Sequence, residues 1–282
     1  MKKRLLTALF GVSFAVGWLF TMYTPAYAII MAVFAVMAEY EMLKVFNVKN
    51  IPFKALCLIV SAGILIYADY RDKFELPFFA AATGVVLLSL VLMVLDFERL
   101  KFEQVVCSLF SAFTISSALS CVVLYRDVYK VYPDLYTMTD GVFYILFSFF
   151  CAWFTDAFAL FSGMALGKHK LAPKISPNKT VEGAVGGVIG CIGTCIALYF
   201  VFRTKYNLSE KITLPFVIIS ALFLSVLSIF GDLAASTIKR HHGVKDFGNL
   251  LPGHGGVMDR FDSSIFVFAA LYAIITVAAR FM

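Results

Sequence analysis

Long apolar blocks recur along the whole chain, each close to the length that a helix needs to cross a lipid bilayer. They fall at about residues 5–20, 26–43, 54–68, 77–95, 104–125, 141–166, 183–202, 212–234 and 263–281. A transmembrane helix takes about 20 mostly apolar residues, whereas a transmembrane β-barrel has alternating segments of about ten residues. Charged residues make up only 15% of the chain. We therefore predict an all-α, polytopic membrane bundle of about nine transmembrane helices.

The N-terminal stretch MKKRLLTALFGVSFAVGWLF also resembles a signal peptide, and the AYA at 26–28 imitates a cleavage site. We expect it to remain as the first transmembrane helix, because a second apolar block follows at once. Proline disfavours helix in the residue before it, so Thr24–Pro25 is the expected break between the first two blocks. One long helix through both blocks is the alternative.

The distribution of Lys and Arg gives the orientation. With a cytoplasmic N-terminus and nine helices, most of the 24 basic residues lie in inner loops: Lys2, Lys3, Arg4, Lys44, Lys49, Lys54, Arg99, Lys101, Lys168, Lys170, Lys174, Lys179, Lys239, Arg240, Lys245 and Arg260. This agrees with the positive-inside rule. A basic inner face attracts anionic lipid head groups, so the net charge of +6 indicates membrane lipids as partners and no nucleic acid.

The two halves of the chain differ in where they carry polar residues. Residues 1–140 have their charges almost only in short connecting loops, and we interpret them as an N-terminal transmembrane scaffold. Residues 141–282 have charged residues, glycine and proline at helix edges, and we predict that this C-terminal transmembrane region is catalytic, within one membrane unit. Asp156 is its deepest acid. A carboxylate at such a depth survives when it faces a bundle interior or a water-filled cavity, so it is either functional or a structural partner.

The basic loop GKHKLAPKISPNKTVEGAVGG, at 167–187, leads into a predicted helix. Thr180, or alternatively Asn178, is suited to cap that helix, with Glu182 in its first turn. A helix N-terminus beside Lys179 suits phosphate. An ordinary basic inner loop with an ordinary cap is the alternative.

A third polar segment, GDLAASTIKRHHGVKDFGNLLPGHGGVMDRFDSS, spans residues 231–264. Helical spacing places Asp232, Ser236, Lys239 and Arg240 on one face. Asp232 and Asp259 could converge on Mg²⁺, which prefers oxygen ligands and phosphate, while cations neutralise a polyphosphate. For His254 we favour a hydrogen bond or phosphate contact over metal ligation. The alternative is a solvated loop between two helices. It explains the lysines, but it explains neither the HGG at 254–256 nor the positions of Asp232 and Asp259 at the edges of apolar helices.

These motifs resemble a known family. The stretch STIKRHHGVKDFGNLLPGHGGVMDRFD, at 236–262, is similar to the C-terminal signature of the phosphatidate cytidylyltransferases, or CDP-diacylglycerol synthases. SPNKTVEG at 176–183 is similar to their upstream motif, and WFTDAFALFSG, with Asp156, resembles a third. Many relatives have an acid where this chain has Ala235, which leaves a possible additional metal or water contact in doubt.

The resemblance implies a Mg²⁺-dependent reaction of CTP with phosphatidic acid that gives CDP-diacylglycerol and pyrophosphate. Asp232 and Asp259 would hold Mg²⁺, with a second cation as a further option. The implied catalytic residues are Asp232, Asp259, Lys239, Arg240 and Ser236. The implied substrate-binding residues are Ser176, Lys179, Thr180, Glu182, Lys245, Asp246, His254, Gly255, Gly256, Arg260, Asp262 and Asp156.

The location expected with this activity is a bacterial cell membrane, with the site on the cytoplasmic side where CTP is found. The expected partners are CTP, phosphatidic acid and membrane lipids, with a homodimer as a further expectation. A CTP-dependent polyprenol kinase is the nearest rival enzyme. A secondary transporter is the rival from another class, but it predicts inverted repeats with charges near the midplane of both halves.

Overall fold

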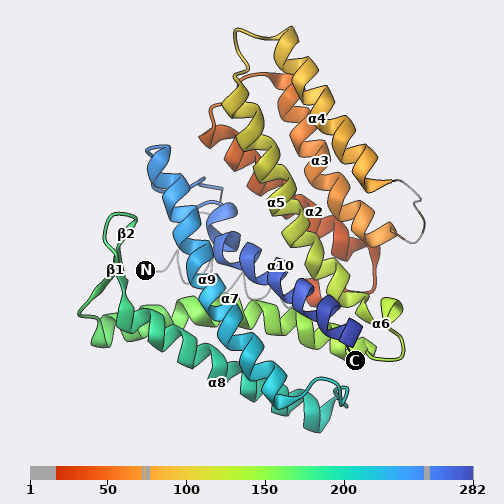
Figure 1. The fold of residues 1–282 in the computed structure, drawn as a ribbon, viewed down its shortest axis with the longest axis vertical. Helices are drawn as coiled ribbons and strands as arrows, with labels where there is room; N and C mark the ends of the chain where they lie inside the picture. Colours follow the sequence, from red (N-terminus) through yellow and green to blue (C-terminus); the bar gives the residue numbers. More distant parts are fainter. Residues whose placement is uncertain (1–16, 72, 74–76, 251–254, 282) are drawn as a thin grey trace. The chain divides into compact units, whose positions relative to one another are not determined.

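The computed structural model describes residues 17–71, 73, 77–250 and 255–281 (Figure 1). Eight helices in this part of the chain are long and apolar enough to span a membrane. They are α2 (Pro25–Val45), α3 (Ile51–Tyr70), α4 (Phe78–Leu95), α5 (Phe102–Arg126), α7 (Met138–Leu166), α8 (Val181–Lys205), α9 (Leu214–His241) and α10 (Met258–Phe281). They match the second to ninth predicted blocks, so the predicted class of helical membrane bundle is confirmed. The block at 5–20 lies outside the described residues, apart from 17–20.

Helix starts follow from local sequence. α2 begins at Pro25, after a Thr24 in extended conformation, so the predicted break between the first two blocks is confirmed. At the start of α3, the side chain of Asn50 accepts a hydrogen bond from the backbone N–H of Phe53 at 2.7 Å. Pro52 lies in the first turn of that helix, where its missing N–H would have no partner within the helix.

The chain divides into two compact units, each formed from two segments. The first unit comprises Met1–Val123 and His242–Arg260, and the second comprises Leu124–His241 and Phe261–Met282. The predicted scaffold (1–140) and catalytic region (141–282) were defined by function, whereas these units are defined by contacts. The predicted division therefore stays a prediction.

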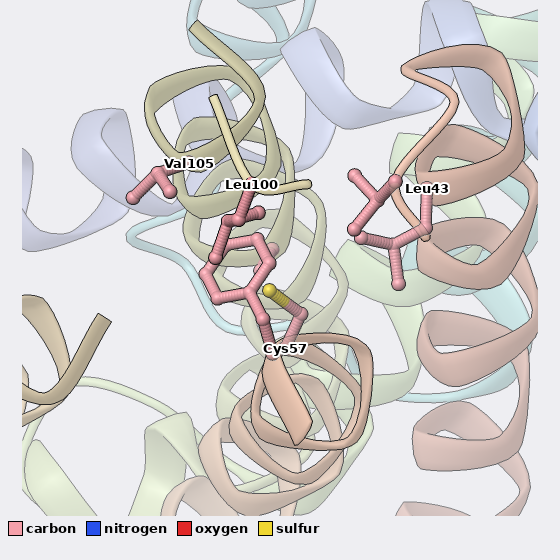
Figure 2. Packing of buried hydrophobic residues seen from close by; sticks show 7 residues of the cluster. Leu43, Cys57, Leu100 and Val105 are labelled. Carbon is pink, nitrogen blue, oxygen red and sulfur yellow. The ribbon is translucent and has the colours of Figure 1, made fainter. Parts of the chain in front are cut away.

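An apolar cluster joins three helices of the first unit. Figure 2 shows Leu43 from α2, Cys57 from α3, and Leu100 and Val105 from the start of the α5 region. The whole cluster consists of Leu43, Val48, Phe53, Cys57, Leu100, Val105 and Ala112. Because it links both short connections, 46–50 and 96–101, it fixes the ends of α2, α3 and α5 against one another.

In the second unit, α8 packs along α7, and α9 contacts both of these helices (Figure 1). Glycines on α8 allow the two backbones to approach closely. A Cβ atom on Gly183 would lie 2.8 Å from the carbonyl oxygen of Ala159, and one on Gly187 would lie 2.7 Å from that of Thr155. Small residues at such an interface are typical of helix packing in membranes.

Two short elements were not anticipated from the sequence. Strands β1 (Lys170–Ala172) and β2 (Ser176–Thr180) form an antiparallel hairpin within the basic loop before α8. A one-turn helix, α6 (Val128–Val131), connects α5 to α7. The hairpin matters for the site because it carries Lys179 and Thr180.

Candidate active site

The hairpin and the start of α8 form a fixed structure at one end of the second unit. The hydroxyl of Thr180 accepts a hydrogen bond from the N–H of Gly183 at 3.1 Å, so the predicted cap is confirmed and the alternative, Asn178, is not needed. Glu182 accepts hydrogen bonds from the N–H groups of Lys168 and His169, at 3.0 and 3.1 Å. Its carboxylate therefore ties the end of α7 to the start of α8.

The two polar motifs of the second unit meet at Asp232 on α9. The ammonium of Lys179, from β2, forms an ion pair with the Asp232 carboxylate. Ser236, one turn further along α9, donates a weak hydrogen bond to Asp232 Oδ1 at 3.4 Å. Segments far apart in the sequence thus bring a cation, a carboxylate and a hydroxyl together.

A second pair of acids lies on the helices around α9. Lys239 Nζ is 3.8 Å from Asp262 Oδ2, and both side chains are only 11% exposed. Ser263, the next residue of α10, donates a hydrogen bond to Asp156 Oδ2 of α7 at 3.0 Å. Asp262 interacts electrostatically with both Asp232 and Asp156. The second unit therefore gathers three carboxylates from α7, α9 and α10.

These side chains fit a divalent magnesium ion by their chemistry. The donors are carboxylate and hydroxyl oxygens, which hard cations prefer, and the three carboxylates outnumber the two lysines beside them. Within the described part of the chain, only the thiols of Cys151, Cys191 and Cys195 form a three-residue group with all ligand atoms within 4.8 Å. The three carboxylates thus do not form such a group. Proteins usually bind Mg²⁺ through one or two carboxylates together with substrate phosphates.

The first unit holds the other predicted ligand, Asp259, in the first turn of α10. Its Oδ2 atom accepts hydrogen bonds from the backbone N–H groups of Phe247, at 2.9 Å, and Gly256, at 3.0 Å. Gly255 adopts a positive φ of 80°, a conformation that glycine takes at little cost. Because Asp232 and Asp259 belong to different units, their predicted convergence stays a prediction.

One residue that contacts the start of α10 was missed from the sequence. Glu41, near the end of α2, accepts hydrogen bonds from the N–H groups of Val257 and Met258, at 3.0 and 2.9 Å. Glu41 is only 1% exposed. An acid close to the end of an apolar block was the available signal, and it did not identify a partner more than two hundred positions away.

The remaining predicted residues have simpler surroundings. Ser176 pairs with Ala172 in the hairpin, and Arg240 Nε donates a hydrogen bond to the carbonyl of Ile175 at 3.3 Å. Lys245, Asp246 and Arg260 are exposed. His254 lies outside the described residues. Within the described part of the second unit, no hydrogen bond or ion pair joins Ser176 or Arg240 to Asp232.

Comparison with known proteins gives full-length matches. A sequence model of the Cytidylyltransferase family matches residues 2–278. A phosphatidate cytidylyltransferase of Bacillus subtilis (strain 168) is 36% identical over 284 residues, which cover 96% of each chain. One of Staphylococcus haemolyticus (strain JCSC1435) is 35% identical over 275 residues, covering 96% of this chain and 97% of its own. One of Staphylococcus aureus (strain COL) is 47% identical over 136 residues, about half of each chain.

Proposed function

Since this chain belongs to the cytidylyltransferase family, we propose that it transfers CMP from CTP to phosphatidic acid and releases pyrophosphate. The observation that carries the proposal is the contact between the two polar motifs of the second unit, in which Lys179 of β2 pairs with Asp232 of α9. Such an arrangement suits a phosphate-bearing substrate, because a cation and a potential metal ligand lie side by side.

The residues support a mechanism without a protein nucleophile. An oxygen of the lipid phosphate attacks the α-phosphorus of CTP, a new P–O bond forms, and the bond to the β-phosphate breaks so that pyrophosphate leaves. Lys179, Lys239 and Arg240 neutralise phosphate charge and orient the nucleotide, and Ser236 orients a phosphate oxygen. Fixed charges of this kind stabilise charge that develops during phosphoryl transfer.

Asp232 and Asp259 are the proposed ligands of the divalent cation, in line with their carboxylate chemistry. When bound, Mg²⁺ would neutralise phosphate charge and polarise the reacting P–O bonds. Asp262 interacts electrostatically with both Asp232 and Asp156, and Ser263 donates a hydrogen bond to Asp156, so these side chains are further candidate oxygen donors. The exposed Lys245 and Arg260 remain candidates for pyrophosphate or the lipid head group.

The proposed site lies on the cytoplasmic side of the membrane. Both motif loops, 167–182 and 239–260, fall on the side where Lys and Arg are concentrated, and CTP is a cytoplasmic nucleotide. A homodimer is the proposed assembly, and the mass of the protein in detergent would test it.

The decisive experiment uses the purified chain with phosphatidic acid, Mg²⁺ and CTP labelled on the α-phosphate. We expect label in the lipid, one pyrophosphate released for each lipid modified, and a lipid mass increase equal to CMP less one water. Parallel reactions with γ-labelled CTP and a polyprenol distinguish the rival enzyme. Label that enters lipid only from the γ-phosphate would contradict the proposal and indicate a kinase.

A further inference from the structure

A buried glutamate of α2 caps the N-terminus of α10. Glu41 Oε1 accepts the N–H of Val257 and Oε2 accepts the N–H of Met258, and Met258 is the first residue of α10. The first N–H groups of a helix have no partner within it, and the helix dipole makes its start favourable for an anion. The Glu41 carboxylate, from a distant part of the chain, supplies both the missing hydrogen-bond acceptors and the negative charge.

Two glycines before α10 pack closely against this carboxylate. Gly248 and Gly256 both lie against it, and a methyl group on either glycine would overlap the Glu41 side chain. Val257 and Met258 are themselves buried, at 1% and 6% exposed. Two glycines, two backbone N–H groups and one acid therefore form a close-packed contact between α2 and the signature segment, the family-like stretch at 236–262.

The same short segment sets the direction of Asp259. Asp259 follows Met258 directly, and its Oδ2 atom binds the N–H of Gly256 at 3.0 Å and that of Phe247 at 2.9 Å. Gly256 is therefore shared, since its N–H bonds to Asp259 while its α-carbon packs against Glu41. Movement of the backbone at 256–258 would carry the Asp259 carboxylate with it.

We propose that Glu41 is a positioning residue for catalysis, which fixes the first turn of α10 and through it the carboxylate of Asp259. The inference rests on the proposed function, in which Asp259 is a metal ligand. It gives the N-terminal half of the chain, interpreted from its sequence as a scaffold, a direct part in arranging the signature segment.

The chain offers a matched control on the same helix. Glu39 is also fully buried, and it accepts a hydrogen bond from Ser111 of α5 at 2.8 Å. This hydrogen bond joins Glu39 to α5 and not to the residues around Asp259. A Glu→Gln change at either position removes one potential charge from a buried site of α2. Only Glu41→Gln places an amide N–H₂ against the backbone N–H of Val257 or Met258.

Two measurements test the inference on the full chain in detergent. The first is kcat and KM for CTP with phosphatidic acid and Mg²⁺. Removing a residue that orients a metal ligand typically costs about 10–100-fold in activity, so we expect Glu41→Gln to lower kcat by about that factor, with a smaller change in KM. Glu39→Gln should stay within about twofold of wild type, as for a change away from the site.

The second measurement is amide hydrogen exchange without metal or nucleotide, which is independent of turnover. We expect the amides of Val257 and Met258 to exchange about tenfold faster or more in Glu41→Gln, because a charge-assisted hydrogen bond is lost. Gly256→Ala should act in the same direction while it leaves the charge of Glu41 in place. Gly63→Ala on α3, where a methyl group meets nothing within 4 Å, is its control.

Each outcome decides the matter. Loss of kcat together with faster exchange in Glu41→Gln and Gly256→Ala, but in neither control, supports the inference. Turnover in Glu41→Gln equal to that in Glu39→Gln overturns it, as does slow turnover with unchanged exchange at 257 and 258. If Glu41→Gln does not fold, Gly256→Ala carries the same test. If the wild-type protein makes no CDP-lipid, the proposed function fails, and the inference about catalysis fails with it even if the exchange data show the anchoring.

Discussion

At the scale of single residues, Asp232 is the carboxylate of the second unit where the two polar motifs meet. It pairs with Lys179 and accepts a hydrogen bond from Ser236. Asp232→Asn keeps the size and one acceptor of this side chain but removes its charge. We expect it to lower the rate of CDP-lipid formation by about 100-fold or more, because electrostatic contacts in such a site carry large effects. The measurement is pyrophosphate release at saturating CTP and Mg²⁺.

Glu210→Gln is a suitable control for this variant. Glu210 lies in the loop between α8 and α9, its side chain is 93% exposed, and it is 3.8 Å from Arg203. An exposed ion pair contributes little to stability, so Glu210→Gln should turn over like the wild type. Wild-type turnover in Asp232→Asn, with normal insertion into the membrane, would rule out Asp232 as a metal ligand.

Asp127 carries a pH-dependent contribution to stability in the connection between α5 and α7. Burial raises the pKa of its carboxyl group, but hydrogen bonds from Arg126 and Lys130 outweigh burial and hold this pKa below its ordinary value. Arg126 donates to both carboxylate oxygens, at 3.0 and 2.6 Å. A folded-state pKa below the unfolded one stabilises the protein at pH values above the unfolded pKa, near 4, and this stabilisation is lost as the pH falls through the folded pKa.

Asp127→Asn should therefore reduce the free energy of unfolding at pH 7 by about 1–3 kcal/mol, as for a buried charged partner left incompletely paired. Its unfolding midpoint should also fall less than that of the wild type as the pH is lowered from 6 to 3. Thermal unfolding in detergent at several pH values measures both effects. The exposed acid Asp134 provides the comparison, since Asp134→Asn should follow the wild-type curve.

At the scale of elements, the α7–α8 contact depends on the absence of side chains on α8. A methyl group on Gly187 would lie 2.7 Å from the carbonyl oxygen of Thr155 and 3.0 Å from the Ala159 Cβ, whereas one on Gly193 meets nothing within 4 Å. We expect Gly187→Ala to reduce the free energy of unfolding by about 1–3 kcal/mol through overpacking. Gly193→Ala, on the same helix, should be neutral or stabilising because alanine favours helix over glycine. Equal unfolding midpoints for the two variants would contradict close packing at Gly187.

The elements also show which local signals are strong. Thr180 was predicted as a helix cap because its side chain and the following Glu182 form a recognisable N-terminal pattern, and the structure confirms the cap. The hairpin that contains Lys170 and Ser176 was not predicted. Its strands are only three and five residues long, and Pro and Asn are depleted in strands, so the sequence gives no period-two pattern to detect.

At the scale of the whole molecule, the sequence was sufficient for the membrane helices and for the family, because both depend on local properties. Eight of the nine predicted spans were recovered within the described residues, since the length and apolarity of a segment decide whether it can cross a bilayer. The pairing of Glu41 with Val257 and Met258 could not be predicted. It depends on tertiary packing between segments that share no periodicity or motif.

Orientation in the membrane can be tested within the second unit alone. α8 has 25 residues and therefore a length of about 37 Å, more than the roughly 30 Å of the hydrocarbon core. Lys174, in the hairpin before α8, and Glu210, in the loop after it, should lie on opposite sides of the membrane. The positive-inside pattern assigns Lys174 to the cytoplasm.

We therefore expect Lys174→Cys to react with a membrane-impermeant maleimide only in inverted vesicles, and Glu210→Cys only in intact cells or spheroplasts. The wild-type chain measures the background, because its six cysteines are buried or half-buried. Labelling of Lys174→Cys from outside would place the hairpin with Lys179 away from cytoplasmic CTP and contradict the proposed location of the site. Labelling of both positions from one side would contradict α8 as a transmembrane helix. Because the two positions flank one continuous helix, the result does not depend on how the two units are arranged.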